Sequence, residues 1–195
     1  MTSPDGESCA FVEPVVLSGA VEMWLDGLES AMMVGLQKLL AESLKLFKSK
    51  NKEKWFRAVA GQLLITTGAI SWTAECHKAL EAIEGGDAKA MKGQKKKQVS
   101  FLNKQTDWIR GQLTKIERSK LVALITMEIH NRDTIAKMIT VKASKPSEFI
   151  WLSQLRFLFT PEDGEIGICG VKQTNNTLEY SYEYQGNNGR LVVTP

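Results

Sequence analysis

The side chains best suited to metal binding or acid–base chemistry in this chain are its histidines and cysteines. His77 and His130 are the only histidines, and Cys9, Cys76 and Cys169 lie far apart in the sequence. Zinc sites bring such ligands together at short spacings, and a metalloprotease helix carries two histidines four residues apart. Neither spacing is present, so the sequence favours neither a metal site nor acid–base catalysis. We expect the cysteines to be reduced thiols outside any disulfide framework.

His130 lies close in the sequence to two charged residues, Arg132 and Asp133. A catalytic or metal-binding histidine would need a second ligand or a proton acceptor one helical turn away. Because no histidine or cysteine has that spacing, we expect His130 to orient a helix contact with Arg132 or Asp133. The three residues are therefore predicted to be structural anchors.

The chain contains none of the glycine-rich motifs that hold phosphates. Neither Gly-x-x-x-x-Gly-Lys-Ser/Thr nor Gly-x-Gly-x-x-Gly occurs, and Gly85-Gly86 follows a helical pattern instead of opening one. We therefore expect the chain to have no catalytic site and to bind neither nucleotide nor metal by itself.

A run of lysines stands out between residues 92 and 97, and Trp108 and Arg110 follow it. A basic patch with aromatic residues could bind nucleic acid or an acidic surface. The net charge of +3 is too small to indicate nucleic acid, so a solvated helix face is favoured. The N-terminus has no apolar signal region and no stretch approaches the roughly 20 apolar residues of a membrane span.

Trp151 and Arg156 are the aromatic and cationic pair most suited to a special role. Arg156 is next to Phe157, and the planar guanidinium can stack or form several hydrogen bonds at once. We expect both to anchor the last helix to the β element, with Arg156 making a multidentate contact. A ligand contact is the alternative.

The periodicity of apolar residues predicts a mainly α fold, an elongated bundle of about five helices with a small C-terminal antiparallel β element. Spacings of three and four residues predict helices at about 18–48, 53–82, 88–110 and 115–141, and a short helix with Pro146 in its first turn. Ser18 is the expected N-cap of the first helix.

After residue 161 the spacing falls to two, which is typical of half-buried strands. The alternating apolar residues are Ile166, Ile168, Val171, Tyr180, Tyr182 and Tyr184. We therefore divide the chain into an extended entry segment (1–17), a helical subdomain (18–160), and a β hairpin with a junction (161–195). The Gly/Asn turn at 186–189 is followed by another apolar run, which suggests that the chain is part of something larger.

Six blocks of this sequence resemble the C-terminal part of the linker in dynein heavy chains, up to the start of the first AAA+ module. The blocks are residues 3–7, 19–25, 62–73, 129–133, 149–156 and 180–195. Residues 95–103 and 136–139 favour the outer-arm axonemal type. Gln185 and Asn131 depart from the family pattern, and Gly167 and Gly170 are expected to interrupt a strand.

The resemblance implies a non-catalytic lever that lies across an AAA+ ring and bends as the first module binds and hydrolyses ATP. The parent would be an ATP-driven, minus-end-directed microtubule motor, an ATPase that uses ATP and Mg. Residues matching the segment that enters the first module beside its nucleotide are Leu191, Val192, Val193, Thr194 and Pro195. The turn at 186–189 would then be a pivot.

The resemblance also implies partners and a location. The partners would be the AAA+ ring of the same heavy chain and, through the parent, dynein intermediate and light chains and microtubules. Neither nucleic acid nor a membrane is implied. The location would be the cytoplasm and cytoskeleton, with a ciliary or flagellar axoneme favoured. The alternative from another class is a free-standing helical adaptor or scaffold without motor activity.

Overall fold

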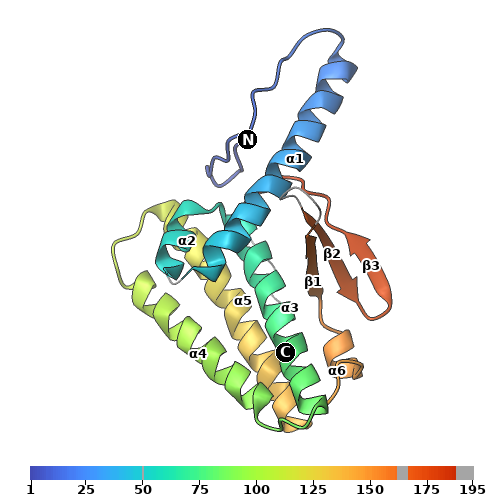
Figure 1. Ribbon diagram of the computed structural model, residues 1–195. Coiled ribbons are helices and arrows are strands. Elements are labelled where there is room, and N and C mark those ends of the chain that lie inside the picture. The colour runs from blue at the N-terminus through green and yellow to red at the C-terminus, as the bar shows by residue number, and fades with distance from the viewer. Residues whose placement is uncertain (50, 162–166, 188–195) are drawn as a thin grey trace.

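A computed structural model describes residues 1–49, 51–161 and 167–187 (Figure 1). The elements in this part of the chain are α1 (Val21–Lys48), α2 (Lys52–Ala58), α3 (Gly61–Glu84), α4 (Ala90–Ile109), α5 (Lys115–Thr140), α6 (Phe149–Leu152), β1 (Arg156–Pro161), β2 (Gly167–Gln173) and β3 (Asn176–Glu179). The predicted fold class, mainly α with a small C-terminal antiparallel sheet, is confirmed.

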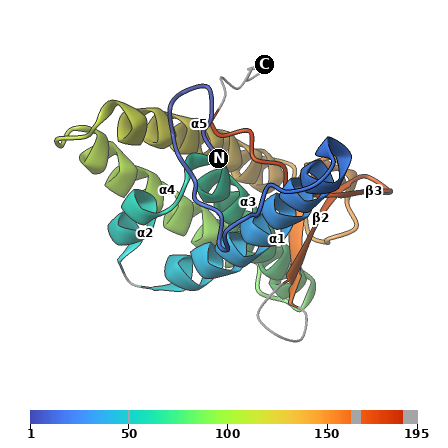
Figure 2. The same ribbon diagram turned by 90° about the horizontal axis from the view of Figure 1, so that it is seen from above.

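The helix α3 is the centre of the molecule. It packs against α4 and α5 on one side and against α1 and β1 on the other, so the small sheet and α4 lie on opposite sides of α3 (Figure 1). The first turns of α1 project beyond this body, with the N-terminal loop returning beside them (Figure 2). Val21 and Leu25 are consequently exposed, although their spacing of four residues is that of a core-facing stripe.

The prediction of one helix over residues 53–82 is wrong, because the chain forms α2 and α3 with a bend between them. Val59 and Ala60 are in extended conformation. The bend frees backbone groups that distant side chains then bind: the Val59 carbonyl accepts a hydrogen bond from Lys120 Nζ at 2.9 Å. Local periodicity continues through both helices and gives no sign of this break.

Two helix starts also differ from the predictions. The N-cap of α1 is Ala20, not Ser18, and it makes no side-chain capping bond. Pro146 lies in a turn before α6 and is outside the helix, which begins at Phe149. By contrast, α5 begins with a capping box in which Thr114 and Glu117 exchange side-chain and backbone bonds.

The sheet has the order β1-β2-β3, and both pairings are antiparallel. The strand β1 was not predicted, since its residues were assigned to the helical part. Gly167 pairs with Pro161 within the sheet, so this glycine does not interrupt a strand. A side chain at Gly167 would collide with the ring of Phe159, which explains the glycine.

Tyr180, Tyr182 and Tyr184 do not form a strand, contrary to the prediction. The chain leaves the sheet after Glu179, and Tyr182 has a positive φ of 54° that reverses its direction. Tyr182 is 3% exposed. Its hydroxyl accepts a hydrogen bond from Cys169 N at 2.7 Å and donates one to Gly167 O at 3.2 Å. One phenol therefore satisfies backbone groups of β2 that β3 does not reach.

The apolar core consists of two clusters along α3. The first joins α1, α2, the start of α3, α5 and β2, with members that include Leu36, Leu40, Trp55, Phe56, Leu64, Leu121, Leu124, Cys169 and Tyr182. The second joins the end of α3, α4, α5 and α6, and includes Trp72, Cys76, Leu80, Met91, Ile135, Met138 and Trp151. Among the helices described, none has the length and apolar character needed to cross a membrane.

Candidate functional site at the start of helix α3

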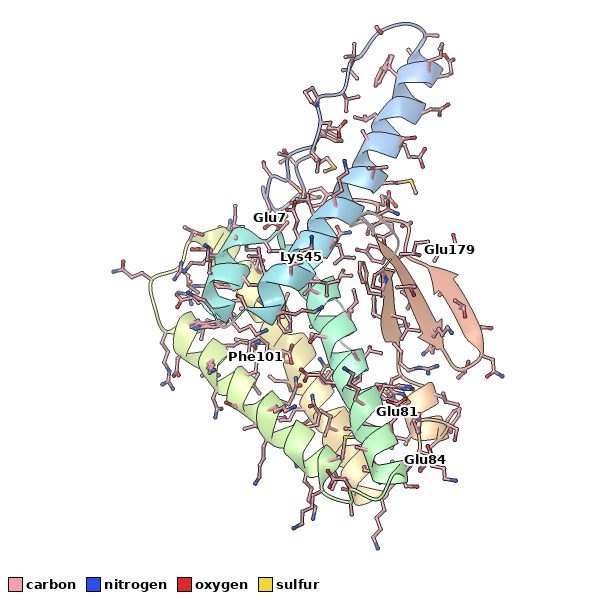
Figure 3. The ribbon with its side chains drawn as sticks, viewed as in Figure 1. Glu7, Lys45, Glu81, Glu84, Phe101 and Glu179 are labelled. Atoms are coloured by element: carbon pink, nitrogen blue, oxygen red, sulfur yellow. The ribbon has the colours of Figure 1, made fainter. Side chains whose placement is uncertain are left out.

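The helix α3 begins without a capping side chain of its own. Its N-cap residue is Ala60, which has no side-chain acceptor. The carboxylate of Glu7 takes that role, because both of its oxygens accept from Gly61 N, at 3.1 and 2.9 Å. A carboxylate at a helix N-terminus satisfies a free N–H group and interacts favourably with the helix dipole. A residue from the N-terminal loop thus fixes the start of the central helix (Figure 3).

Lys120 from α5 completes the charge balance at this point. Its Nζ lies 3.4 Å from Glu7 Oε1, and the two side chains are only 6% and 7% exposed. A buried ion pair is stable only where further hydrogen bonds satisfy its remaining groups. The Val59 carbonyl and Gly61 N supply those bonds. The bend between α2 and α3 is therefore held from two distant parts of the chain.

Gln62, the second residue of α3, binds the segment that follows the sheet. We call residues 180–187 the exit segment. The Gln62 amide nitrogen donates to Tyr180 OH at 2.9 Å and to the Glu183 carbonyl at 2.7 Å. Its amide oxygen accepts from Gln185 N at 2.8 Å and from Gly186 N at 3.1 Å. One side chain therefore makes four hydrogen bonds to a segment without regular secondary structure.

The exit segment also meets the N-terminal loop and two further helices. A side chain at Gly186, which has a positive φ of 70°, would collide with the Ser3 side chain, so the Gly186 backbone lies directly against Ser3. Asn187 Nδ2 donates to Ser119 Oγ on α5 at 3.2 Å. Tyr184 N donates to the sulfur of Met32 on α1 at 3.5 Å. Burial raises the pKa of the Tyr184 phenol to about 12, and the nearby Glu7 carboxylate acts in the same direction.

Together these contacts form what we call the α3 junction: Glu7, Gly61, Gln62, Lys120 and the exit segment. Its polar groups bind one another, and the junction contains no histidine or cysteine. The arrangement fixes the position of these chain segments relative to α3. Elsewhere, no group of three or more histidine, cysteine or acidic side chains among the described residues could hold a metal ion.

The three cysteines are free and buried. Burial raises the pKa of the Cys76 thiol and of the Cys9 thiol, and raises that of Cys169 to about 12. A thiol must ionise to act as a nucleophile or a metal ligand. These three thiols therefore remain protonated at neutral pH and serve as small apolar side chains.

Trp151 and Arg156 lie near one another in the chain but have different surroundings. Trp151 is fully buried and packs against Trp72 of α3, with ring centroids 5.4 Å apart. Arg156 is the first residue of β1, and its Nη2 donates to the Thr174 carbonyl in the β2–β3 turn at 3.2 Å. Its buried Nε has no hydrogen-bond partner among the described residues. Arg156 thus links two parts of the sheet through a single bond.

Arg132 and Asp133 form an ion pair between adjacent residues on α5, with Nη2 and Oδ1 2.7 Å apart. His130 is exposed, and its side chain makes no hydrogen bond or ion pair with another described residue. The structure therefore shows neither a hydrogen bond nor an ion pair between the His130 side chain and Arg132 or Asp133. Leu191, Val192, Val193, Thr194 and Pro195 lie outside the described residues, as do positions 188 and 189 of the predicted pivot.

The residues of the α3 junction were not identified individually from the sequence. Glu7 and Gln62 fall within blocks that resemble the dynein linker, but periodicity assigns them no role. Once the structure places a helix start at Gly61, one local feature can be seen in the sequence: the N-cap residue Ala60 has no capping side chain. That pattern indicates that a distant acceptor is needed, although it does not identify Glu7.

No protein-family model matches the chain. The chain is 47% identical over 195 residues to the dynein-1-beta heavy chain of the flagellar inner arm I1 complex from Chlamydomonas reinhardtii. It is 47% identical over 198 residues to dynein axonemal heavy chain 2 and 37% identical over 195 residues to dynein axonemal heavy chain 9, both from Homo sapiens. Each match covers 100% of this chain and 4% of the relative.

Proposed function

We propose that this chain, which is homologous along its whole length to a segment of axonemal dynein heavy chains, acts as part of the mechanical linker of a microtubule motor. The chain spans 4% of the length of these relatives, so the activity of a whole heavy chain is part of the proposal. The parent would be a minus-end-directed ATPase of the ciliary or flagellar axoneme. The outer-arm type stays a prediction, and one of the relatives is named for an inner arm.

The observation that carries this proposal is the set of four hydrogen bonds from Gln62 to the exit segment. A lever must transmit a load from one chain segment to a rigid element. Load applied beyond residue 187 would reach α3 through these bonds and through the Asn187 contact with α5. The helix α3 packs against α1, α4, α5 and β1, so it can distribute that load through the body.

In the full motor, the partners of this segment would be the AAA+ ring of the same heavy chain and, through the parent, intermediate and light chains and microtubules. ATP and Mg would bind the ring and not this chain. The assignment of nucleotide binding to the ring is supported by the sequence of this chain, which has no glycine-rich phosphate loop. Pure chain titrated with ATP and Mg should show no micromolar binding isotherm, and saturable binding at that level would contradict the non-catalytic role.

The mechanical role is tested by Gln62→Ala in a complete heavy chain that contains this segment. We expect microtubule gliding to slow while ATP turnover continues, because the substitution loosens the exit segment from α3 without touching a nucleotide site. Gln112→Ala is the matched control, since Gln112 is exposed in the loop between α4 and α5. Unchanged gliding velocity per ATP hydrolysed in Gln62→Ala would show that the junction does not carry the load.

A further inference from the structure

A groove lies between α3, α4 and the adjacent ends of α1 and α2. It encloses a cavity of about 480 Å³, within the range of roughly 300–1,000 Å³ that is usual for ligand pockets. Aromatic side chains line it: Phe47 from α1, Trp72 from α3 and Phe101 from α4. Phe101 projects from α4 toward the body of the molecule (Figure 3) and meets Phe47 edge to face, with centroids 6.0 Å apart. The groove can therefore accept an apolar side chain.

The same groove is lined by lysines. Lys52 comes from α2, and Lys96, Lys97 and Lys104 come from α4. None of the four has an acidic partner within ion-pair distance among the described residues, which differs from the buried pairing of Lys120.

Lys52 shows how crowded these positive charges are. Its Nζ lies 3.3 Å from the centre of the Phe47 ring. Partial burial lowers the pKa of Lys52, Glu75 opposes the change and the positive charge of Lys104 adds to it. An anion placed between Lys52 and Lys104 would relieve this repulsion.

Two carboxylates also line the groove, and neutral amides hold both of them. Gln94 Nε2 donates to Glu75 Oε2 at 2.7 Å, and Gln98 donates to Glu128. Glu128 is 3% exposed, so it belongs to the floor. A polyphosphate chain lying along the groove would meet Glu75, which is exposed. A peptide can instead place separate carboxylates on the lysines and avoid this acid.

We propose that this groove binds an acidic peptide segment with one aromatic side chain, which packs against the aromatic lining beside the Phe47–Phe101 pair while flanking carboxylates contact the lysines. Separate contributions from charge and from one apolar anchor are the usual basis of such recognition. This binding would be additional to the mechanical role and does not depend on it. The proposal means that the lysines of α4 bind a specific class of partner, whereas the sequence favoured a helix face that only contacts solvent.

The test measures fluorescence anisotropy of a labelled glutamate-rich peptide with one central phenylalanine, titrated with the purified chain. We expect saturable binding that weakens with added salt, because exposed charge contacts are screened. Replacing the phenylalanine by alanine in the peptide should weaken binding. The variant Lys97→Gln/Lys104→Gln should weaken it by about three- to tenfold, as expected for two partly solvated charge contacts.

The charge-matched control is Lys115→Gln/Lys137→Gln, which removes two exposed lysines from α5 and should bind as the unmodified chain does. The unfolding midpoint of each variant establishes that it is folded. The proposal is overturned if the two lysine variants lose equal affinity or if the alanine peptide binds as well as the phenylalanine peptide. Tighter binding of a single-stranded oligonucleotide would overturn it in favour of nucleic acid.

Discussion

The two ends of α3 are held by different kinds of interaction. At its start, Glu7, Lys120 and Gln62 bind the N-terminal loop, the bend and the exit segment through directed polar contacts. From its middle to its end, the contacts are mainly apolar, and Trp72 packs against Trp151 within a cluster of aliphatic and thiol side chains. The same helix therefore combines core packing with directed polar contacts at its start, and depends mainly on apolar packing at its end.

This difference follows from the kind of structure that each end of α3 binds, which is packed helices at one end and an irregular segment at the other. Apolar contact is non-directional and roughly proportional to buried area, so it holds helices together without selecting one atom over another. Hydrogen bonds require specific distances and angles, so they fix the position of a segment with no regular structure. Exit-segment residues such as Glu183 and Gln185 contribute little apolar area, and their backbone groups are held by Gln62 instead.

The largest expected effect is at the apolar end. Trp151→Ala should lower the free energy of unfolding by about 3–5 kcal/mol, because it removes a fully buried ring and leaves a cavity against Trp72. Denaturant unfolding measures the change. Phe149→Ala is the control, since Phe149 is 74% exposed, and it should change stability little. Similar losses in the two variants would show that Trp151 is not a core residue.

At the polar end, Glu7→Ala should cost about 3 kcal/mol, because it leaves Lys120 buried without its carboxylate and removes the cap of α3. The double variant Glu7→Ala/Lys120→Met should be less destabilised than the sum of the two single variants. Denaturant unfolding of all four proteins gives the coupling energy. Strict additivity would mean that the two side chains do not interact.

Glu128 differs from Glu7 in its partner. Both carboxyl groups are buried, but Glu128 accepts from the neutral amide of Gln98, whereas Glu7 is paired with the cation of Lys120. Burial raises its pKa from 4.5 to about 7, and Glu75 acts in the same direction. The folded state therefore binds this proton more tightly than the unfolded state. The resulting stabilisation is present below pH 4.5 and is lost as the pH rises to about 7.

We expect Glu128→Gln to remove this pH dependence and to be more stable than the unmodified chain at about pH 8, by up to about 3 kcal/mol. Unfolding midpoints at about pH 5 and about pH 8 measure it. Glu75→Gln, at an exposed position on α3, is the control and should keep most of the dependence. Equal pH profiles for Glu128→Gln and the unmodified chain would show that Glu128 titrates normally.

The smallest effect is expected at Arg156, where the sequence suggested a multidentate anchor. Its guanidinium makes one hydrogen bond, to the Thr174 carbonyl, and Nε is buried without a partner among the described residues. A lysine can donate to the same carbonyl, so Arg156→Lys should change stability by less than about 1 kcal/mol. A larger loss in denaturant unfolding would indicate that the planar group makes contacts a lysine cannot replace.

The sequence by itself determined the fold class and the course of most helices. Helix periodicity is a local property, and apolar residues three and four apart predict α1, α4 and α5 to within a few residues. The resemblance of six sequence blocks to dynein heavy chains could also be found without a structure, because it depends on order and spacing along the chain. The burial of Trp151 in the core also agrees with the general tendency of large aromatic side chains to be buried.

Tertiary structure alone decided the bend before α3, the strand β1 and the conformation of the exit segment. The contacts responsible join residues 54, 61 and 118 positions apart: Glu7 with Gly61, Lys120 with Val59, and Gln62 with Tyr180. No local pattern records which distant side chain will supply a missing acceptor or donor. The alternation of Tyr180, Tyr182 and Tyr184 predicts a strand, yet the Tyr182 phenol binds β2 directly and the backbone turns away. Periodicity reports which side chains avoid water, whereas the folded chain determines which polar groups meet.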